Sequence, residues 1–495
     1  MKIIIIGNGI LALSTAFRLL KQGDSELVII GPRARTGGAT PAAAAMLNSF
    51  AELEHGSLES KESLEYFGMS HLAAQMWPSF ERELIEYAGD LLPVECASCQ
   101  ILTGGCFGRG TYVINNSTTN HLEDLNYNAV IAGLKEFNES FFEVEPDSIP
   151  NYFPEARSRA QRALLIPNEG WLNPKIVLNK LENILYSNPK VKYIDDVVTV
   201  LNFNGIDMVE SVTVSSGVKI VGENVLLANG VGVTGLIENT PYANLIPPVF
   251  SSVGVSIEIR SINEKHSNVI RSPNRGGGCG IYTAPYFKGP NWPRNHILIG
   301  ASSVTTLNPR FYGRIVSVSH LLHSAIKEVN QEFYNAELIG VNVGNRPIAL
   351  DGYPLLGRVD GSNLFIITGT KRDGFHLAPL ISEFIAKQII SPNSVNPYTL
   401  FRPDRDVIKD IPIEKAENSF VASKINEAYQ HGFVATNHFQ VQQLEADWLS
   451  KIRFVHSEIG ATTFGVPTQM YSVYRDILGD PVTNRNLLEY VKNQY

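Results

Sequence analysis

MKIIIIGNGILALSTAFRLL, residues 1–20, is the stretch that decides the fold. Its four consecutive isoleucines, residues 3–6, form an apolar β-branched run that is too short to cross a membrane and is typical of a parallel strand buried on both faces. The sequence GNGILA follows at residues 7–12, and apolar side chains then recur at helical spacing up to Leu20. A strand, a G-x-G-x-x-A turn and a helix in this order predict a βα unit that binds a dinucleotide.

The residues of this turn each have a role in such a site. Gly7 permits the tight turn, Gly9 lets a pyrophosphate lie against bare backbone, and Ala12 keeps the helix close to the sheet. Ile10 and Leu11 belong to the same turn, and the helix that follows it offers free N–H groups at its N-terminus and a partial positive charge to the phosphates. The alternative is a βα unit whose glycines serve packing only.

Composition excludes several classes of protein. The 495 residues are enough for two or more cores, and 44% apolar and 18% charged residues are ordinary for a globular protein. A net charge of −8 without a basic stripe argues against a nucleic-acid partner. No run approaches the ~20 apolar residues of a membrane span, and the first apolar run lacks a signal-peptide cleavage site. We therefore expect a cytoplasmic protein without a membrane partner.

The cysteines do not predict a metal site. Cys96 and Cys99 form a C-x-x-C pair, whereas a structural zinc needs about four ligands and the chain has no second pair. Cys106 and Cys279 stand alone. We expect ordinary reduced thiols and no bound metal.

The second predicted strand, residues 27–30, departs from the usual dinucleotide site. An acidic residue normally follows this strand and binds the adenosine ribose, but this chain has Gly31. The departure argues against a plain nicotinamide site and leaves the ribose to backbone, water or another side chain. Arg33 and Arg35 in the next loop are candidates for a phosphate contact, although exposed loop arginines are commoner.

Two later segments present small residues to a large ligand. Residues 37–47, GGATPAAAAML, place four alanines after Thr40 and Pro41, which predict a capped helix start beside something large and flat. The predicted strand at residues 225–227 ends in Ala-Asn-Gly, where close backbone contact with a cofactor is again expected.

The remaining pattern predicts helices and an antiparallel sheet. Strands that alternate over residues 247–259 and 280–301 indicate the sheet. The segment from about residue 400 to 495 is polar and helical. Residues 52–89 are expected to be rich in helix, and further helices are expected near residues 129–137, 176–186, 322–333 and 379–390.

These segments, in this order, resemble the FAD-dependent oxidoreductases of the D-amino-acid oxidase family, closest to glycine oxidase, from residue 1 to about 398. The first glycine turn corresponds to the family's ADP-binding turn. Residues 40–47, TPAAAAML, resemble the family's T-S-A-A-A-G-M-L run beside the flavin, with departures at Pro41 and Ala45.

Three further motifs carry the resemblance. YTAP at residues 282–285 resembles a Y-x-V-P segment whose tyrosine lines the substrate pocket. RPIALDGYP at residues 346–354 resembles R-P…D-G-x-P, whose arginine binds the substrate carboxylate. GTKRDG at residues 369–374 is similar to G-H-F-R-N-G, which covers the far end of the flavin, although Thr370 replaces a common histidine.

The resemblance implies FAD as cofactor and four catalytic candidates. Arg346 would hold a carboxylate, with a structural arginine as the alternative; Tyr282 would donate to substrate or pack between sheets. Arg372 would touch substrate or flavin, and His376 would face the pocket or belong to the core. Lys371 would favour reduced flavin and its reaction with oxygen, or be a solvated loop lysine. The turn and the resemblance together assign these residues to the cofactor site: Gly7, Gly9, Ile10, Leu11, Ala12, Arg33, Thr40, Ala42, Ala43, Ala44, Met46, Val198, Ala228, Asn229, Gly230, Arg346, Gly369, Arg372, Asp373, Gly374, Phe375 and His376.

The fold class implied is α/β, in three parts. A discontinuous Rossmann-like FAD-binding domain takes residues 1–90, 150–245 and 340–398, and a substrate domain on an antiparallel sheet takes residues 91–149 and 246–339. A mainly helical C-terminal extension, residues 399–495, exceeds what this fold needs. We expect it to be a packed subdomain or a homo-oligomer contact, or else a cap over the substrate pocket or a docking site for a protein.

The function implied is oxidation of an amine, either an amino acid or an N-substituted amino acid, to an imine by hydride transfer to flavin. Oxygen is the expected acceptor. One alternative is a dehydrogenase of the same fold that passes electrons to a carrier. The other is a catalytically degenerate flavoprotein scaffold whose extension binds a partner protein.

Overall fold

The computed structural model describes residues 1–44, 46–88, 107–116, 118, 120–205, 207–262, 266–275, 280–286, 295–392 and 394–495. Ala45 and all four cysteines, Cys96, Cys99, Cys106 and Cys279, lie outside these ranges, so the expectation of reduced thiols is not addressed. Within the described ranges, no helix combines the length and apolarity that crossing a membrane requires.

The first strand lies in the middle of a six-stranded sheet, and its isoleucines face both sides. Ile3 and Ile5 belong to one apolar cluster, and Ile4 and Ile6 belong to another. The strand is therefore buried on both faces, as its β-branched run predicts. The strands, in order across the sheet, are β18 (Leu355–Arg358), β19 (Leu364–Thr368), β11 (Asn224–Leu227), β1 (Lys2–Ile6), β2 (Glu26–Ile30) and β7 (Val191–Ile194).

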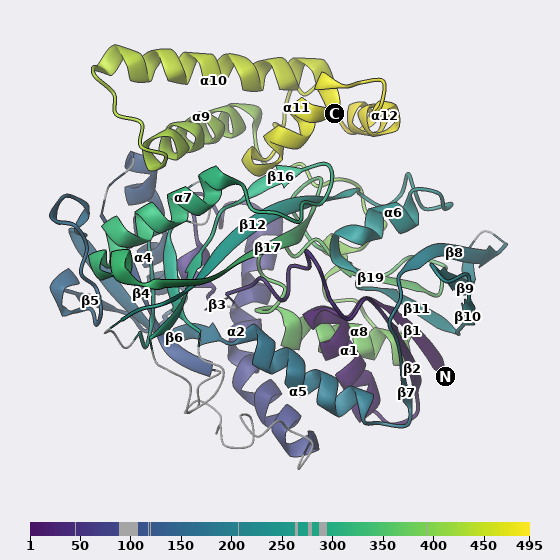
Figure 1. Cartoon of the computed structure of the whole chain (residues 1–495). Helices are drawn as coiled ribbons and strands as arrows, with labels where there is room; N and C mark the ends of the chain where they lie inside the picture. The colour runs from purple at the N-terminus through teal and green to yellow at the C-terminus, as the bar shows by residue number, and fades with distance from the viewer. Residues whose placement is uncertain are drawn as a thin grey trace.

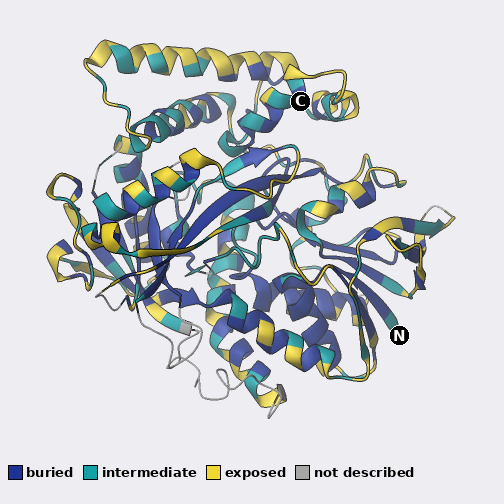
Figure 2. Cartoon of the chain, in the orientation of Figure 1, coloured by how far each residue is buried: buried dark blue, intermediate teal, exposed yellow. Residues whose placement is uncertain are grey.

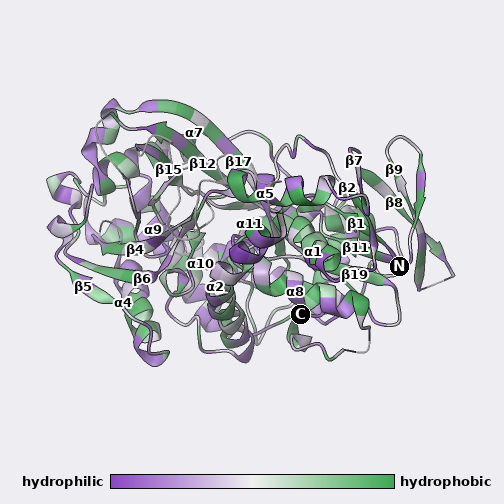
Figure 3. Cartoon of the chain, turned by 90° about the horizontal axis from the view of Figure 1, so that it is seen from below, coloured by the Kyte–Doolittle hydropathy of each residue, from purple (hydrophilic) through white to green (hydrophobic). Residues whose placement is uncertain are grey.

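Helices cover one face of this sheet and a small sheet covers the other (Figure 1). All of its strand pairs are parallel except β18 with β19. Strands β1, β2 and β11 consist mostly of hydrophobic residues, in keeping with this position (Figure 3). The covering elements are α1 (Ile10–Lys21), α2 (Lys61–Ala88), α5 (Pro174–Tyr186) and α8 (Ala378–Ile390) on one face, and β8 (Val198–Asn204), β9 (Met208–Val214) and β10 (Lys219–Val221) with α6 (Val233–Ile237) on the other.

A second, larger sheet is mostly antiparallel, as the alternating segments predict. Its central pair is β12 (Val249–Arg260) with β17 (Glu337–Ala349). Helices α4 (His121–Glu136) and α7 (Ile315–Ser324) pack beside it (Figure 1). The other strands are β3 (Met46–Leu47), β4 (Phe107–Asn115), β5 (Phe142–Val144), β6 (Arg162–Leu172), β13 (Val269–Arg271), β14 (Tyr282–Pro285), β15 (His296–Gly300) and β16 (Val304–Thr306).

The C-terminal extension forms a helical layer over the large sheet (Figure 1). Phe250 of β12 and Ile348 of β17 share an apolar cluster with Phe420 and Ile452 of the extension. The far face of α10 is largely exposed (Figure 2). The extension contains α9 (Ile413–Gln430), α10 (His438–Ile459), α11 (Tyr471–Gly479) and α12 (Arg485–Gln494).

Two helix predictions are wrong in part. Residues 40–42 form a turn, in which the Ala43 N–H donates to the Thr40 carbonyl, and the chain then pairs as β3 with β6 instead of continuing as a helix. The helix expected at residues 322–333 is α-helical only to Ser324. A π-helical segment (Ala325–Val329) follows, and the extended backbone of Asn330 ends it.

Candidate functional site

A cavity of about 530 Å³ lies where the first glycine turn meets the large sheet. Its wall combines the start of α1, the loop after β2, the end of β11, strand β17 and the turn after β19. Of the residues predicted for the cofactor and the chemistry, the lining contains Gly7, Gly9, Ile10, Leu11, Thr40, Ala42, Ala43, Ala44, Met46, Ala228, Asn229, Gly230, Tyr282, Arg346, Arg372, Asp373, Gly374 and Phe375.

Five of the predicted residues lie outside this lining. Ala12 is fully buried in the core beneath α1, and Val198 is buried in the opposite core while Val197 lines the cavity. Gly369 packs against Pro354. Arg33 and His376 are the other two residues outside the lining.

The glycine turn brings bare backbone to the cavity. Gly7 has φ +120°, and a Cβ atom there would lie 2.3 Å from the Ala228 carbonyl oxygen of the neighbouring strand. The Ile10 N–H, at the N-terminus of α1, donates to the Thr40 hydroxyl at 3.2 Å. The segment that contains the alanines is thus tied to the helix N-terminus at the cavity wall.

The position of the missing acidic residue is filled by Asn8. A Cβ atom on Gly31 would lie 2.9 Å from Cγ of Asn8, whose Nδ2 donates to the Pro32 carbonyl at 2.9 Å. The Tyr193 hydroxyl donates to the Gly31 carbonyl at 2.6 Å. An acidic side chain at position 31 therefore has no room, and Asn8 lines the cavity there.

Of the two candidate arginines, Arg35 lines the cavity and Arg33 does not. The Nε of Arg35 donates to the Asn8 carbonyl at 2.9 Å, and its guanidinium is ion-paired with Glu182. The guanidinium of Arg33 lies 5.4 Å from the ring centroid of Tyr193, and its side chain is exposed.

At the end of β11, a residue that lines the cavity carries a buried acceptor. The Oδ1 atom of Asn229 is buried and accepts no hydrogen bond from the described residues. Next to it, the Gly230 carbonyl accepts a hydrogen bond of 2.9 Å from Thr368 of β19. Because a buried acceptor without a partner is costly, this atom indicates a ligand that carries hydroxyl or N–H donors.

Glycines on neighbouring strands make room for Tyr282 and Arg346. Tyr282 of β14 lies opposite Gly300 of β15, where a Cβ atom would lie 2.2 Å from the tyrosine hydroxyl oxygen. A Cβ atom on Gly254 of β12 would lie 1.8 Å from Nη2 of Arg346, which donates to the Ser302 carbonyl at 2.8 Å. Neither glycine was predicted from the sequence, although an isolated glycine in a strand of larger residues is a known signal for close approach.

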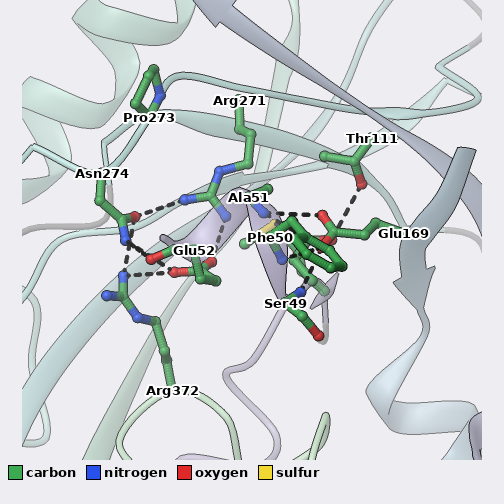
Figure 4. A network of polar contacts seen from close by, with 12 residues as sticks. Ser49, Phe50, Ala51, Glu52, Thr111, Glu169, Arg271, Pro273, Asn274 and Arg372 are labelled. Carbon is green, nitrogen blue, oxygen red and sulfur yellow. Dashed lines mark hydrogen bonds and ion pairs between the residues drawn. The ribbon is translucent and has the colours of Figure 1, made fainter. Parts of the chain in front are cut away.

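The third predicted group, Arg372, belongs to a charged network (Figure 4). Its Nη1 lies 3.2 Å from Oε2 of Glu52, which also lines the cavity and is ion-paired with the buried Arg271. Arg271 Nη2 donates to Asn274 Oδ1 at 2.7 Å. Burial raises the pKa of Glu52, but the two arginines lower it more, to about 2, so this carboxylate is ionised at neutral pH.

A second carboxylate anchors the same segment. Glu169 accepts from the backbone N–H groups of Ser49 at 2.6 Å and Phe50 at 2.5 Å, directly before Glu52 (Figure 4). Burial raises the pKa of Glu169 to about 7 even though these N–H groups lower it. Glu52, Arg271 and Glu169 were absent from the sequence prediction because their partners are distant in the chain.

His376 is buried behind the cavity. Its Nε2 lies 2.8 Å from the Ser70 carbonyl, 3.0 Å from the Ser70 hydroxyl and 3.1 Å from the Ser49 hydroxyl. Burial lowers its pKa. This placement favours a packed core histidine.

Lys371 does line the cavity, and its Nζ lies 6.0 Å from the ring centroid of Tyr353. Burial, together with the charge of Arg372, lowers the pKa of Lys371.

Comparison with known proteins identifies one family. The model described as "DAO: FAD dependent oxidoreductase" matches residues 2–388. No curated protein matches the chain.

Solved structures of several oxidoreductases share the fold. Glycine oxidase from Geobacillus kaustophilus has a TM-score of 0.65 at 21% identity, over 82% of this chain and 99% of that one. Iminodiacetate oxidase from Chelativorans sp. BNC1 has a TM-score of 0.64 at 18% identity, over 81% and 98%. L-proline dehydrogenase from P. horikoshii has a TM-score of 0.62 at 15% identity, over 82% and 97%.

Proposed function

The chain belongs to the family of FAD-dependent oxidoreductases, and we propose that it oxidises an amine that carries a carboxylate, with oxygen as the electron acceptor. The amine is an amino acid or an N-substituted amino acid. The observation that carries this proposal is that Arg346 and Tyr282 line the same cavity as the glycine turn. The names of the similar structures, glycine oxidase and iminodiacetate oxidase among them, support this substrate class.

The cavity residues fit FAD. The N-terminus of α1 and the bare backbone at Gly7 and Gly9 suit a pyrophosphate. The unpartnered Oδ1 of Asn229 suits the hydroxyls of a ribose or ribityl chain. We propose that Asn8 and Arg35 take part in binding the adenosine half, in place of the missing acidic side chain.

We keep the predicted domain division as part of the proposal. The six-stranded sheet draws its strands from the three segments assigned to the FAD domain. Strands β3 and β6 and most of β17, residues 340–349, extend from those segments into the large sheet. The cavity thus lies where the two proposed domains meet.

When bound, FAD supplies the group that accepts a hydride from the carbon that bears the amine. The guanidinium of Arg346 holds the substrate carboxylate with charge-assisted hydrogen bonds, while the Ser302 carbonyl fixes Nη2 in direction. The hydroxyl of Tyr282 donates a further hydrogen bond to substrate. Together they orient the reacting C–H bond, which is what a protein must do when the cofactor supplies the chemistry.

Arg372 and Lys371 have different proposed roles. Glu52 neutralises Arg372, so we assign to Arg372 the task of shaping the wall. The ammonium of Lys371 supplies positive charge that favours reaction of reduced flavin with oxygen.

The test begins with purified protein, which should be yellow and release FAD on denaturation. Candidate amines are mixed with it under anaerobic conditions, and bleaching of the flavin absorption identifies substrates. Arg346→Ala should raise KM for carboxylate substrates and leave that for an amine without a carboxylate unchanged. Air-driven peroxide formation slower than reduction of an added dye would favour the carrier-dependent alternative, and an equal effect on both amines would refute the assignment of Arg346.

A further inference from the structure

The start of the C-terminal extension enters the core beneath the cavity. Phe401 is fully buried and shares an apolar cluster with Phe375, which lines the cavity. Its ring is stacked on that of Tyr353 at 5.7 Å and meets that of Tyr66 edge-on at 6.1 Å. The rings of Tyr66 and Tyr353 are 6.4 Å apart. We call Tyr66, Tyr353 and Phe401 the aromatic trio.

Both hydroxyl groups of the trio bind carboxylates. The Tyr66 hydroxyl donates to Oδ2 of Asp373, a cavity residue, at 2.7 Å. The Tyr353 hydroxyl donates to Oδ2 of Asp410, in the extension, at 2.6 Å. Asp410 also accepts from the Ser60 hydroxyl at 2.6 Å, directly before the helix that carries Tyr66. The extension therefore reaches Asp373 both through the rings and through the start of α2.

A buried ion pair joins the extension to a second support of the cavity. The carboxylate of Asp351 is fully buried and pairs with both terminal nitrogens of Arg405, at 2.5 and 3.1 Å. The Ile408 N–H donates to the same carboxylate at 3.0 Å. These bonds fix the turn at residues 351–354 to residues 405–408.

The cavity turn rests on this fixed turn. A Cβ atom on Gly369 would lie 3.1 Å from Cα of Pro354. A Cβ atom on Gly352 would lie 3.3 Å from Nζ of Lys371 and 3.0 Å from Nε2 of Gln469 in the extension. Because the backbone of residues 353–355 packs against Gly369, movement of the 351–354 turn would displace the backbone where the cavity turn begins.

We propose that Asp410 and Arg405 are positioning residues that hold the turn Thr370–Gly374 in place for bound FAD. Asp410 acts through Tyr353, Ser60 and Tyr66, and Arg405 acts through Asp351. The extension is then a working part of the cofactor site, although the family match ends at residue 388. This inference rests on the proposed function in one respect, because it takes the turn to contact the cofactor.

The test measures FAD affinity by titrating apoprotein, together with the flavin absorption spectrum and the unfolding temperature. Tyr66→Phe removes a hydrogen bond to a carboxylate, and Asp410→Asn replaces charge-assisted hydrogen bonds with weaker neutral ones. Each should weaken FAD binding by about 10-fold and shift the flavin spectrum. The double variant should lose less than the product of the two, because both act on the same turn. Arg405→Lys retains the charge and should recover most of the affinity that Arg405→Met loses.

The matched control is Lys415→Ala, which removes an exposed ion pair between the extension and Glu59. It should leave FAD affinity within about 2-fold of the wild type. If Asp410→Asn lowers the unfolding temperature but leaves FAD affinity and the spectrum unchanged, the residue is merely structural and the proposal is overturned. Independent, multiplicative effects in the double variant would overturn the shared route.

Failure of the proposed function gives a different result. Wild-type protein that binds FAD but is reduced by no amine refutes the proposed substrate, and the FAD titrations still decide whether Asp410 and Arg405 position the turn.

Discussion

Gly254→Ala tests whether the space beside Arg346 sets the substrate preference. The added Cβ atom would lie 1.8 Å from Nη2 of Arg346, so the guanidinium must leave its 2.8 Å contact with the Ser302 carbonyl. Hydrogen bonds to charged groups contribute about 1.5–3 kcal/mol each, and losing one to the substrate carboxylate raises KM by roughly 10- to 150-fold.

The assay compares KM for a carboxylate substrate with KM for an amine that lacks the carboxylate. Only the first should rise, because an amine without a carboxylate makes no hydrogen bond to Arg346. Gly340→Ala, in the paired strand β17, is the control, since a Cβ atom there meets nothing within 4 Å. A folded Gly254→Ala variant with wild-type KM for both amines refutes the role of Arg346 in binding carboxylate.

Four other predictions address the cofactor, the ribose side, the charged network and the acceptor. Removing FAD should lower the unfolding temperature. Added FAD at about 100 times its Kd should restore about 2.7 kcal/mol of unfolding free energy, whereas added NAD should restore none. Equal stabilisation by NAD would count against the cofactor assignment. Gly31→Asp should weaken FAD binding and lower stability, because a Cβ atom at position 31 would lie 2.9 Å from Cγ of Asn8. Gly235→Asp is the control and should do neither, because the space around Gly235 is open. Tighter FAD binding by Gly31→Asp in titrations would contradict this prediction. The pKa of Glu52 falls from 4.5 to about 2 on folding, so above pH 4.5 Glu52 contributes about 3 kcal/mol to the free energy of unfolding. This contribution is lost as the pH drops toward 2, so the difference in stability between wild type and Glu52→Gln should become smaller on acidification. Urea unfolding at several pH values measures the difference, and a constant difference would show that Glu52 is not ionised as described. Lys371→Met should slow flavin reoxidation by oxygen by at least about 10-fold and leave the rate of dye reduction unchanged. Stopped-flow reoxidation at the wild-type rate would show that Lys371 has no role in the reaction with oxygen.

Local signals account for the parts of the fold that could be predicted. The isoleucine run and the glycine turn are complete within residues 1–20, and the structure places them as a strand buried on both faces followed by a helix. The helix expected after Thr40 and Pro41 was wrong because β6 offers backbone partners to residues 46–47, and pairing with a distant strand overrides a local cap.

Contacts between distant residues explain what sequence reasoning missed. From the sequence, Gly31 shows only that the usual acidic residue is missing. The reason is Asn8, which follows a different strand and occupies the space beside Gly31 in the folded chain. Glu52 carries no motif of its own; its role appears only when Arg271 and Arg372, more than two hundred residues away, meet it in the folded chain. The extension has no recognisable motif, and its hold on Asp351 follows from tertiary packing alone.

The central place of β1 constrains how the protein is made. Strand β1 is the first to leave the ribosome, and on one side its partner is β11. The next partner of β11 is β19, which lies some 140 residues later in the chain. Until β11 has emerged, the nascent polypeptide exposes the isoleucine-rich edge of β1 with no partner, and such edges are prone to aggregate. We therefore expect that production of this protein depends on chaperones that protect the nascent chain. We also expect that FAD binds only after translation is nearly complete.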